Sequence, residues 1–264
     1  MVQSLFDLIS MEEFIIQIFC SIFNDYFKID NYDRKILSNT IHKWFIGREE
    51  IEYNKIILNE LSKDKPLNYD FSLIKNHLPS EVIGVLLSDF KKLIKCEGFE
   101  LNKTLKLYQE LESFFNDDYK EFEKTINLIK NNKVPNAVSI YHAIGTITYI
   151  VLCVDDNVKK SEFIAIKNNL KVWDNVSARL ILFYFQLYEK IESINNGPFS
   201  ETSYFTETKK SLVTNYLIYL KNELKPSERR IINNQIMSII KADGIIHENE
   251  RWIWNSIKST WTDL

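Results

Sequence analysis

The chain has 264 residues, enough for one large domain or for two domains of about 130 residues. Hydrophobic residues make up 45% of the chain and charged residues 26%, as in an ordinary globular protein with a substantial core. The formal net charge of −3 excludes the strongly basic composition of a protein that binds nucleic acid mainly by neutralising phosphates. The chain contains only 6 Gly and 5 Pro, which favours helices over many short strands.

The cysteines and the most apolar run indicate the compartment. Cys20, Cys96 and Cys153 are odd in number and far apart, and none belongs to a C-x-x-C pair. Neither a disulfide framework nor a thiolate zinc site is therefore expected, and a reducing cytoplasm fits best. The most apolar run, residues 14–23, has about half the length that a membrane span requires. We expect a cytoplasmic protein with no transmembrane segment.

Apolar residues recur at helical spacing through most of the chain, and no alternating strand pattern is present, which predicts an all-α fold. A polar segment at residues 131–136 contains the helix breaker Pro135 and predicts a boundary between two domains, residues 1–130 and 131–264. The predicted helices cover residues 14–23, 30–47, 49–61, 79–93, 101–115, 119–130, 137–154, 161–173, 175–194, 209–224, 227–241 and 249–261.

A spaced pattern of acidic and aromatic residues repeats along the chain. An acid at a predicted turn is followed after 7 residues by a second acid and after 18 by an aromatic residue. Each copy predicts a helical hairpin that cannot bury its apolar face alone, so the hairpins are expected to pack in pairs, one pair in each half. The two full copies are Asp155, Glu162, Trp173 and Asp243, Glu250, Trp261, and weaker copies in the first half run from Asp25 to Trp44 and from Glu97 to Phe115.

The segments from Ile150 to Glu162 and from Ile239 to Glu250 resemble the paired A-D-G-x-hydrophobic-x-x-x-E motifs of the tellurite-resistance TerB-like family. The resemblance implies one all-helical TerB-like domain over residues 131–264 and an eroded second copy over residues 1–130. Asp156 stands where the family has Gly. The resemblance also implies a binding or scaffold protein in bacterial stress response or phage defence, whose motif acids chelate a divalent ion.

Two interpretations of the motif acids remain open. Glu162 and Glu250 stand three residues after Lys159 and His247, the spacing at which a glutamate caps the start of its own helix. Lysine and histidine are poor N-caps, so only half of a capping box is expected. Alternatively, Asp155, Glu162, Asp243 and Glu250 converge as four hard oxygen ligands for Ca²⁺, Mg²⁺ or Mn²⁺. A self-contained EF-hand is excluded, because apolar and basic residues occupy its earlier ligand positions.

Sequence motifs for catalysis are absent. No histidine follows a glutamate at the spacing of a di-iron site, and no phosphate-binding loop, Rossmann fingerprint, nucleophile elbow or zinc-protease motif is present. We therefore expect a non-enzymatic protein without an organic cofactor. A metal-dependent enzyme that uses the same acids and a helical accessory protein that binds nucleic acid remain the alternatives. The basic pairs at residues 159–160, 209–210 and 229–230 are predicted to be solvated helix ends.

The tryptophans have two predicted roles. Those in the repeat, Trp44, Trp173 and Trp261, are expected in the core together with Phe115. Two others, Trp252 and Trp254, stand two positions apart on one helix and cannot both face the same core. Exposed tryptophan and arginine dominate many protein interfaces. We therefore predict a contact site for another protein at Arg251, Trp252 and Trp254.

Overall fold

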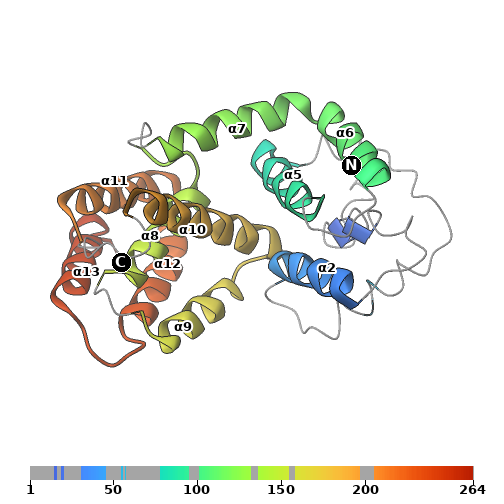
Figure 1. The fold of residues 1–264 in the computed structure, drawn as a ribbon. Coiled ribbons are helices and arrows are strands. Elements are labelled where there is room, and N and C mark those ends of the chain that lie inside the picture. The colour runs from blue at the N-terminus through green and yellow to red at the C-terminus, as the bar shows by residue number, and fades with distance from the viewer. Residues whose placement is uncertain are drawn as a thin grey trace, which may run out of the picture. The chain divides into compact units, whose positions relative to one another are not determined.

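The computed structural model describes residues 15–16, 19–20, 31–45, 55, 57, 78–94, 101–131, 136–154, 158–196 and 205–263. Within these ranges the regular structure is helical and contains no strand (Figure 1), which confirms the predicted all-α class. None of the described helices is both long and apolar enough to cross a membrane. The helices are α2 (Asn31–Trp44), α5 (Ser80–Ile94), α6 (Leu101–Phe114), α7 (Asn116–Lys130), α8 (Ile140–Leu152), α9 (Lys160–Leu170), α10 (Asn175–Asn196), α11 (Glu207–Glu223), α12 (Pro226–Ile240) and α13 (Glu248–Thr260).

The helices agree with the predicted ranges. From α5 onward every predicted helix is present, with ends that differ by only a few residues. The start of α7 lies earlier than predicted because Asp117 and Asp118 occupy its first turn, where acidic side chains favour a helix. The predicted helices at residues 14–23 and 49–61 fall largely outside the described residues, although the few described positions within them are helical.

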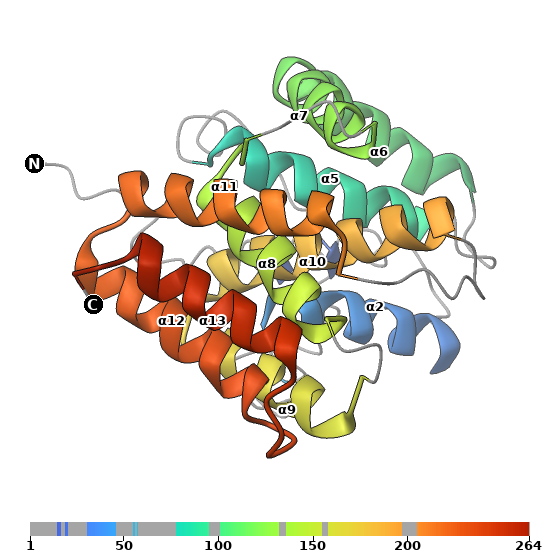
Figure 2. The same cartoon turned by 90° about the vertical axis from the view of Figure 1, so that its left-hand side faces the viewer.

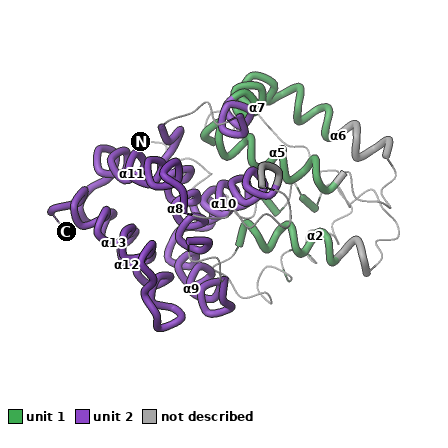
Figure 3. Tube along the Cα trace, turned by 60° about the vertical axis from the view of Figure 1, so that its left-hand side comes forward, with its two compact units in different colours: residues 1–124 green, residues 125–264 purple. Residues whose placement is uncertain are grey.

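The chain divides into two compact units, residues 1–124 and 125–264 (Figure 3). The division falls within α7, and the boundary predicted at residues 131–136 directly follows the end of that helix. In unit 1, α5 packs against α2 and α6. The Trp44 indole donates to Asp89 Oδ2 at 3.1 Å, and both side chains are buried. This bond ties α2 to α5 inside the core of unit 1.

In unit 2, α8 is the central helix and packs against α10, α11 and α12 (Figure 2). Nine of its 13 residues are buried. Gly145 allows the close approach of α10, because a Cβ atom at this position would lie 2.5 Å from the Ile181 carbonyl oxygen. Helix α12 packs against both α8 and α9, and α13 packs against α11 and α12. The hairpins α8–α9 and α12–α13 are therefore in contact through α12.

Candidate functional site

The turn between α12 and α13 carries the acid that begins the last copy of the repeat. Asp243 accepts the Ile245 amide at its Oδ1 atom, 2.9 Å away, and so closes a local turn. The intervening Gly244 has φ +83°, a backbone conformation that side chains with a Cβ atom rarely adopt. The Asp-Gly pair thus fixes the direction in which the chain leaves α12.

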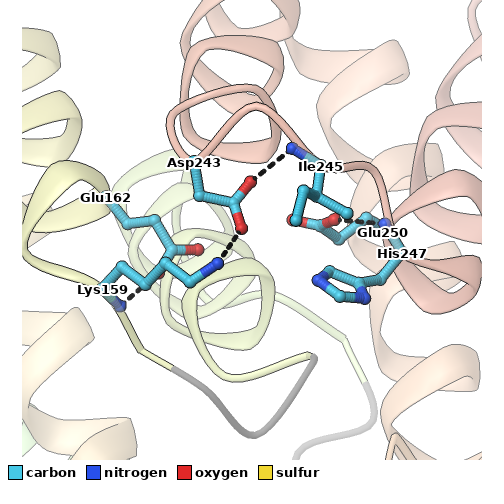
Figure 4. A network of polar contacts seen from close by, with 6 residues as sticks. All are labelled: Lys159, Glu162, Asp243, Ile245, His247 and Glu250. Atoms are coloured by element: carbon cyan, nitrogen blue, oxygen red, sulfur yellow. Dashed lines mark hydrogen bonds and ion pairs between the residues drawn. The ribbon is translucent and has the colours of Figure 1, made fainter.

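The second oxygen of Asp243 joins this turn to the start of α9. Lys159 Nζ lies 2.5 Å from Asp243 Oδ2 (Figure 4). The Asp243 side chain is only 6% exposed. The hydrogen bond from the Lys159 ammonium, followed by the bond from the Ile245 amide, lowers the pKa of Asp243. Both carboxylate oxygens of Asp243 are therefore engaged by groups of the chain itself.

The two motif glutamates cap their own helices. Glu162 Oε2 accepts the Lys159 amide at 2.6 Å, and Glu250 Oε2 accepts the His247 amide at 2.8 Å. Both glutamates are only 2% exposed. Lysine has no acceptor atom, so the Lys159 side chain cannot complete a reciprocal capping box. Each glutamate therefore makes the capping bond that its spacing in the sequence predicts. The spacing did not predict that both side chains would be buried.

A third glutamate makes the same bond without the rest of the motif. Glu228 Oε2 accepts the Lys225 amide at 2.8 Å at the start of α12, where the glutamate is exposed. Lys221, not an acid, stands seven residues before it. Capping by the third helical residue is therefore a local feature of these helix starts and requires no turn acid.

The predicted metal ligands are only partly described by the structure. Asp155 lies outside the described residues, and Asp243, Glu162 and Glu250 make the bonds given above. Within the described part of the chain, no group of three or more His, Cys, Asp or Glu side chains is arranged to hold a metal ion. As placed, the described acids do not form a cation site, because the Lys159 ammonium supplies the positive charge beside Asp243. Convergence of all four acids stays a prediction.

The prediction of solvated basic pairs is wrong for the first residue of each pair. Lys159 is ion-paired with Asp243, and Lys209 Nζ lies 2.8 Å from Glu192 Oε2. Arg229 is buried and pairs with Asp263, while it also donates to the Lys221 carbonyl oxygen. Long basic side chains bury their aliphatic stems and still reach an acid, which the pattern of charges along a sequence does not show.

The repeat tryptophans differ in burial. Trp44, Trp261 and Phe115 are buried, as predicted, and the Trp261 indole donates to the Leu217 carbonyl oxygen at 2.9 Å. Trp173 is only half-buried, so its predicted core position is wrong. It lies beyond the end of α9, where its indole donates to Gln235 Oε1 at 3.1 Å and its ring lines a small pocket.

The predicted contact residues lie on α13. Trp252 and Trp254 are both half-buried, and Arg251 is exposed. The Trp252 ring packs edge-on against Phe205, with the ring centroids 5.3 Å apart. Lys258 Nζ lies 3.9 Å from the Trp254 ring centroid, a cation–π contact. Both tryptophans thus retain exposed aromatic surface beside cationic side chains.

A buried histidine was not singled out from the sequence. His142 Nδ1 accepts the Val138 amide at 3.2 Å, so Nε2 carries the proton and faces the Tyr216 hydroxyl at 3.4 Å. Burial lowers the pKa of His142 from 6.5 to about 4. The available sequence signal is its position within α8, a helix whose residues are apolar on nearly all sides.

No family model matches the chain, and neither the curated proteins nor the solved structures give a significant match. Membership of the TerB-like family therefore stays a prediction that rests on the two motifs. The function has to be inferred from the geometry of the described residues.

Proposed function

We propose that this chain is a non-enzymatic protein-binding module, in which α13 presents the contact surface. The observation that carries the proposal is the pair of half-buried tryptophans on α13, Trp252 and Trp254, beside the exposed Arg251. Tryptophan and arginine are enriched among the residues that supply most of the binding energy in protein interfaces, and tryptophan also buries a large area.

The rest of α13 supports this role by fixing the tryptophans on a rigid element. Ile253 and Ile257 are buried on the inner side of the helix, and Trp261 anchors its end against α11. Glu250 caps its first turn. A contact surface on such a helix loses little conformational freedom on binding, which favours affinity.

A photo-crosslinking amino acid at Asn255, exposed on α13, tests the proposal in bacterial cells. We expect a discrete crosslinked protein that disappears in the Arg251→Ala, Trp254→Ala variant while the helical circular dichroism is unchanged. The matched control carries the crosslinker at Asn222, exposed on α11. Absence of a discrete product at 255, or the same product at 222, contradicts the proposal.

We further propose that the module works in a cytoplasmic bacterial stress-response or phage-defence system and is TerB-like. The support is the pair of motifs that end at Glu162 and Glu250 and the helical hairpins that carry them. A shared architecture alone carries no functional conclusion, so the partner identified by crosslinking is the deciding measurement.

Divalent-metal binding by Asp155, Glu162, Asp243 and Glu250 is a second candidate. The observation that favours it is that the two hairpins are in contact, so that Asp243 of one lies within bonding distance of Lys159 at the start of α9 in the other. One positive charge already lies between the two hairpins, and a divalent ion would have to displace it. We expect Lys159→Met to strengthen the binding heats of Ca²⁺, Mg²⁺ or Mn²⁺ in titration calorimetry. Unchanged heats in an Asp155→Ala, Asp243→Ala variant would exclude the metal site.

A further inference from the structure

The outer side of α9 exposes large apolar side chains among lysines. Phe163 and Ile164 are each 52% exposed, and Val172, just beyond the helix, is 67% exposed. The inner side is anchored by Ile166 and Leu170, which are buried. We call Lys160, Phe163, Ile164, Lys167, Lys171 and Val172 the α9 face.

The three lysines of the α9 face form one stripe. Residues of an α-helix advance by about 100° each, so Lys160, Lys167 and Lys171 fall within about 40° of one another. Phe163 and Ile164 lie on opposite sides of this stripe, about 60° and 40° from Lys160. The buried residues Ile166 and Leu170 lie on the side of Phe163, so the outermost line of the helix passes close to Ile164 and Lys171, and Phe163 lies at the inner edge of the stripe.

None of the ion pairs among the described residues includes a lysine of this stripe. The acid of α9 itself, Glu162, is buried and bonds to the Lys159 amide. In contrast, the buried or bridging cations Lys159 and Lys209 each have an acidic partner. The α9 face therefore presents three positive charges that the carboxylates of an anionic partner can pair with.

We propose that the α9 face binds an acidic segment of a partner protein that also carries apolar side chains. Carboxylates of such a segment would pair with the lysine stripe, and its apolar residues would cover Phe163, Ile164 and Val172. Charge complementarity of this kind directs a partner to the surface, while burial of the apolar side chains contributes affinity. The inference deepens the proposed protein-binding function by giving the chemistry of a second contact surface, and it does not depend on α13.

The placement of the side chains favours protein over the two other anionic partners. A flat bilayer would reach Ile164 but not Phe163, because these two side chains lie about 100° apart around the helix and Phe163 stands next to the buried Leu170. A nucleic acid would gain a stacking surface only from Phe163, since Ile164 and Val172 have no aromatic ring. A protein segment is irregular enough to contact the stripe and both flanks.

Fluorescence anisotropy with the full chain and a labelled synthetic peptide tests the proposal. The peptide carries Glu and Leu at helical spacing, and a matched peptide carries Lys in place of Glu. We expect the chain to bind only the acidic peptide, with an affinity that falls as salt is raised. The Lys160→Gln, Lys167→Gln, Lys171→Gln variant should bind at least about tenfold more weakly. The Phe163→Ser, Ile164→Ser variant should also weaken binding, although it leaves all three lysines in place.

The control variant is Lys120→Gln, Lys124→Gln, Lys130→Gln, which removes three exposed lysines from α7 and the same net charge. This variant should bind the acidic peptide as tightly as the unmodified chain does. The Arg251→Ala, Trp254→Ala variant should also bind it with unchanged affinity, which would show that the α9 face and the contact surface on α13 are separate. Replacing the stripe lysines by Glu should transfer binding to the Lys peptide.

Three outcomes would overturn the proposal. The first is no binding of the acidic peptide by the unmodified chain. The second is equal weakening in the α7 control. The third is tighter binding of phosphatidylserine vesicles or of a single-stranded oligothymidylate that depends on the same three lysines, which would assign the α9 face to a membrane or to nucleic acid.

Discussion

The hairpins α8–α9 and α12–α13 share one sequence spacing but occupy different environments in unit 2. Their second helices begin alike, with Glu162 and Glu250 bonded to the N-cap amide and buried to the same degree. Their first helices differ, because α8 buries 9 of 13 residues among three other helices, whereas α12 buries 6 of 15. The spaced motif thus fixes the start of a helix, and the residues outside it decide how deeply the hairpin lies.

The aromatic residues at the ends of the hairpins show the same contrast. Trp261 is 1% exposed and bonds to a backbone carbonyl of α11, while Trp173 is half-buried and bonds to the Gln235 side chain. The spacing of 18 residues from the turn acid is the same in both. Equivalent positions in a repeat are therefore not equivalent in their contribution to stability.

The largest effect expected from this contrast is at the tryptophans. Trp261→Ala removes a fully buried ring and leaves a cavity, so we expect it to lower the free energy of unfolding by about 3–5 kcal/mol. Trp173→Ala, the matched control, should cost roughly 1–2 kcal/mol because this side chain is only partly buried. Urea unfolding followed by circular dichroism measures both. Equal losses would show that the two ends of the repeat are equivalent after all.

The helices and their caps were accessible from the sequence because both depend on neighbours along the chain. Apolar periodicity located α5 to α13, and the spacing from His247 to Glu250 identified a cap. The bond between Lys159 and Asp243 joins residues that are 84 positions apart, so the pairing of charges along the sequence could not indicate it. Trp173 was misplaced for a related reason, since its burial depends on which helices pass beyond the end of α9.

The second largest effect expected is a dependence of the stability on pH, which distinguishes α8 from α12. His142 of α8 occupies the position that the exposed Arg230 occupies in α12, 88 residues later. Its pKa is about 4 in the folded chain and 6.5 when unfolded, so the unfolded chain takes up the proton first as the pH falls. Stability due to neutral His142 is complete above pH 6.5 and is lost between pH 6.5 and 4, by about 3 kcal/mol in total.

Unfolding by urea at pH values from 7 to 4 tests this expectation. His142→Asn keeps an acceptor for the Val138 amide and should remove that part of the pH dependence. Arg230→Ala should leave the pH dependence as it is. If His142→Asn and the unmodified chain lose stability in parallel over this range, the histidine is not the group that titrates.

The smallest effect separates capping from any further role of the motif glutamates. Glu162→Gln and Glu250→Gln preserve the shape of the side chain but replace a charged acceptor by a neutral one and bury an amide group, at a cost of about 1–3 kcal/mol each. Glu228→Gln makes the same change at an exposed cap and should cost no more than about 0.5 kcal/mol. Thermal unfolding with and without added Ca²⁺, Mg²⁺ or Mn²⁺ measures the loss of stability due to capping and any loss due to metal binding.

If the glutamates only cap their helices, each substitution lowers the stability equally with and without the ion. The larger loss at Glu162 and Glu250 than at Glu228 then reflects their burial alone. A loss at these two positions that appears only in the presence of the ion would instead assign them to a metal site, because Glu228 has the same cap but no acid seven residues before it.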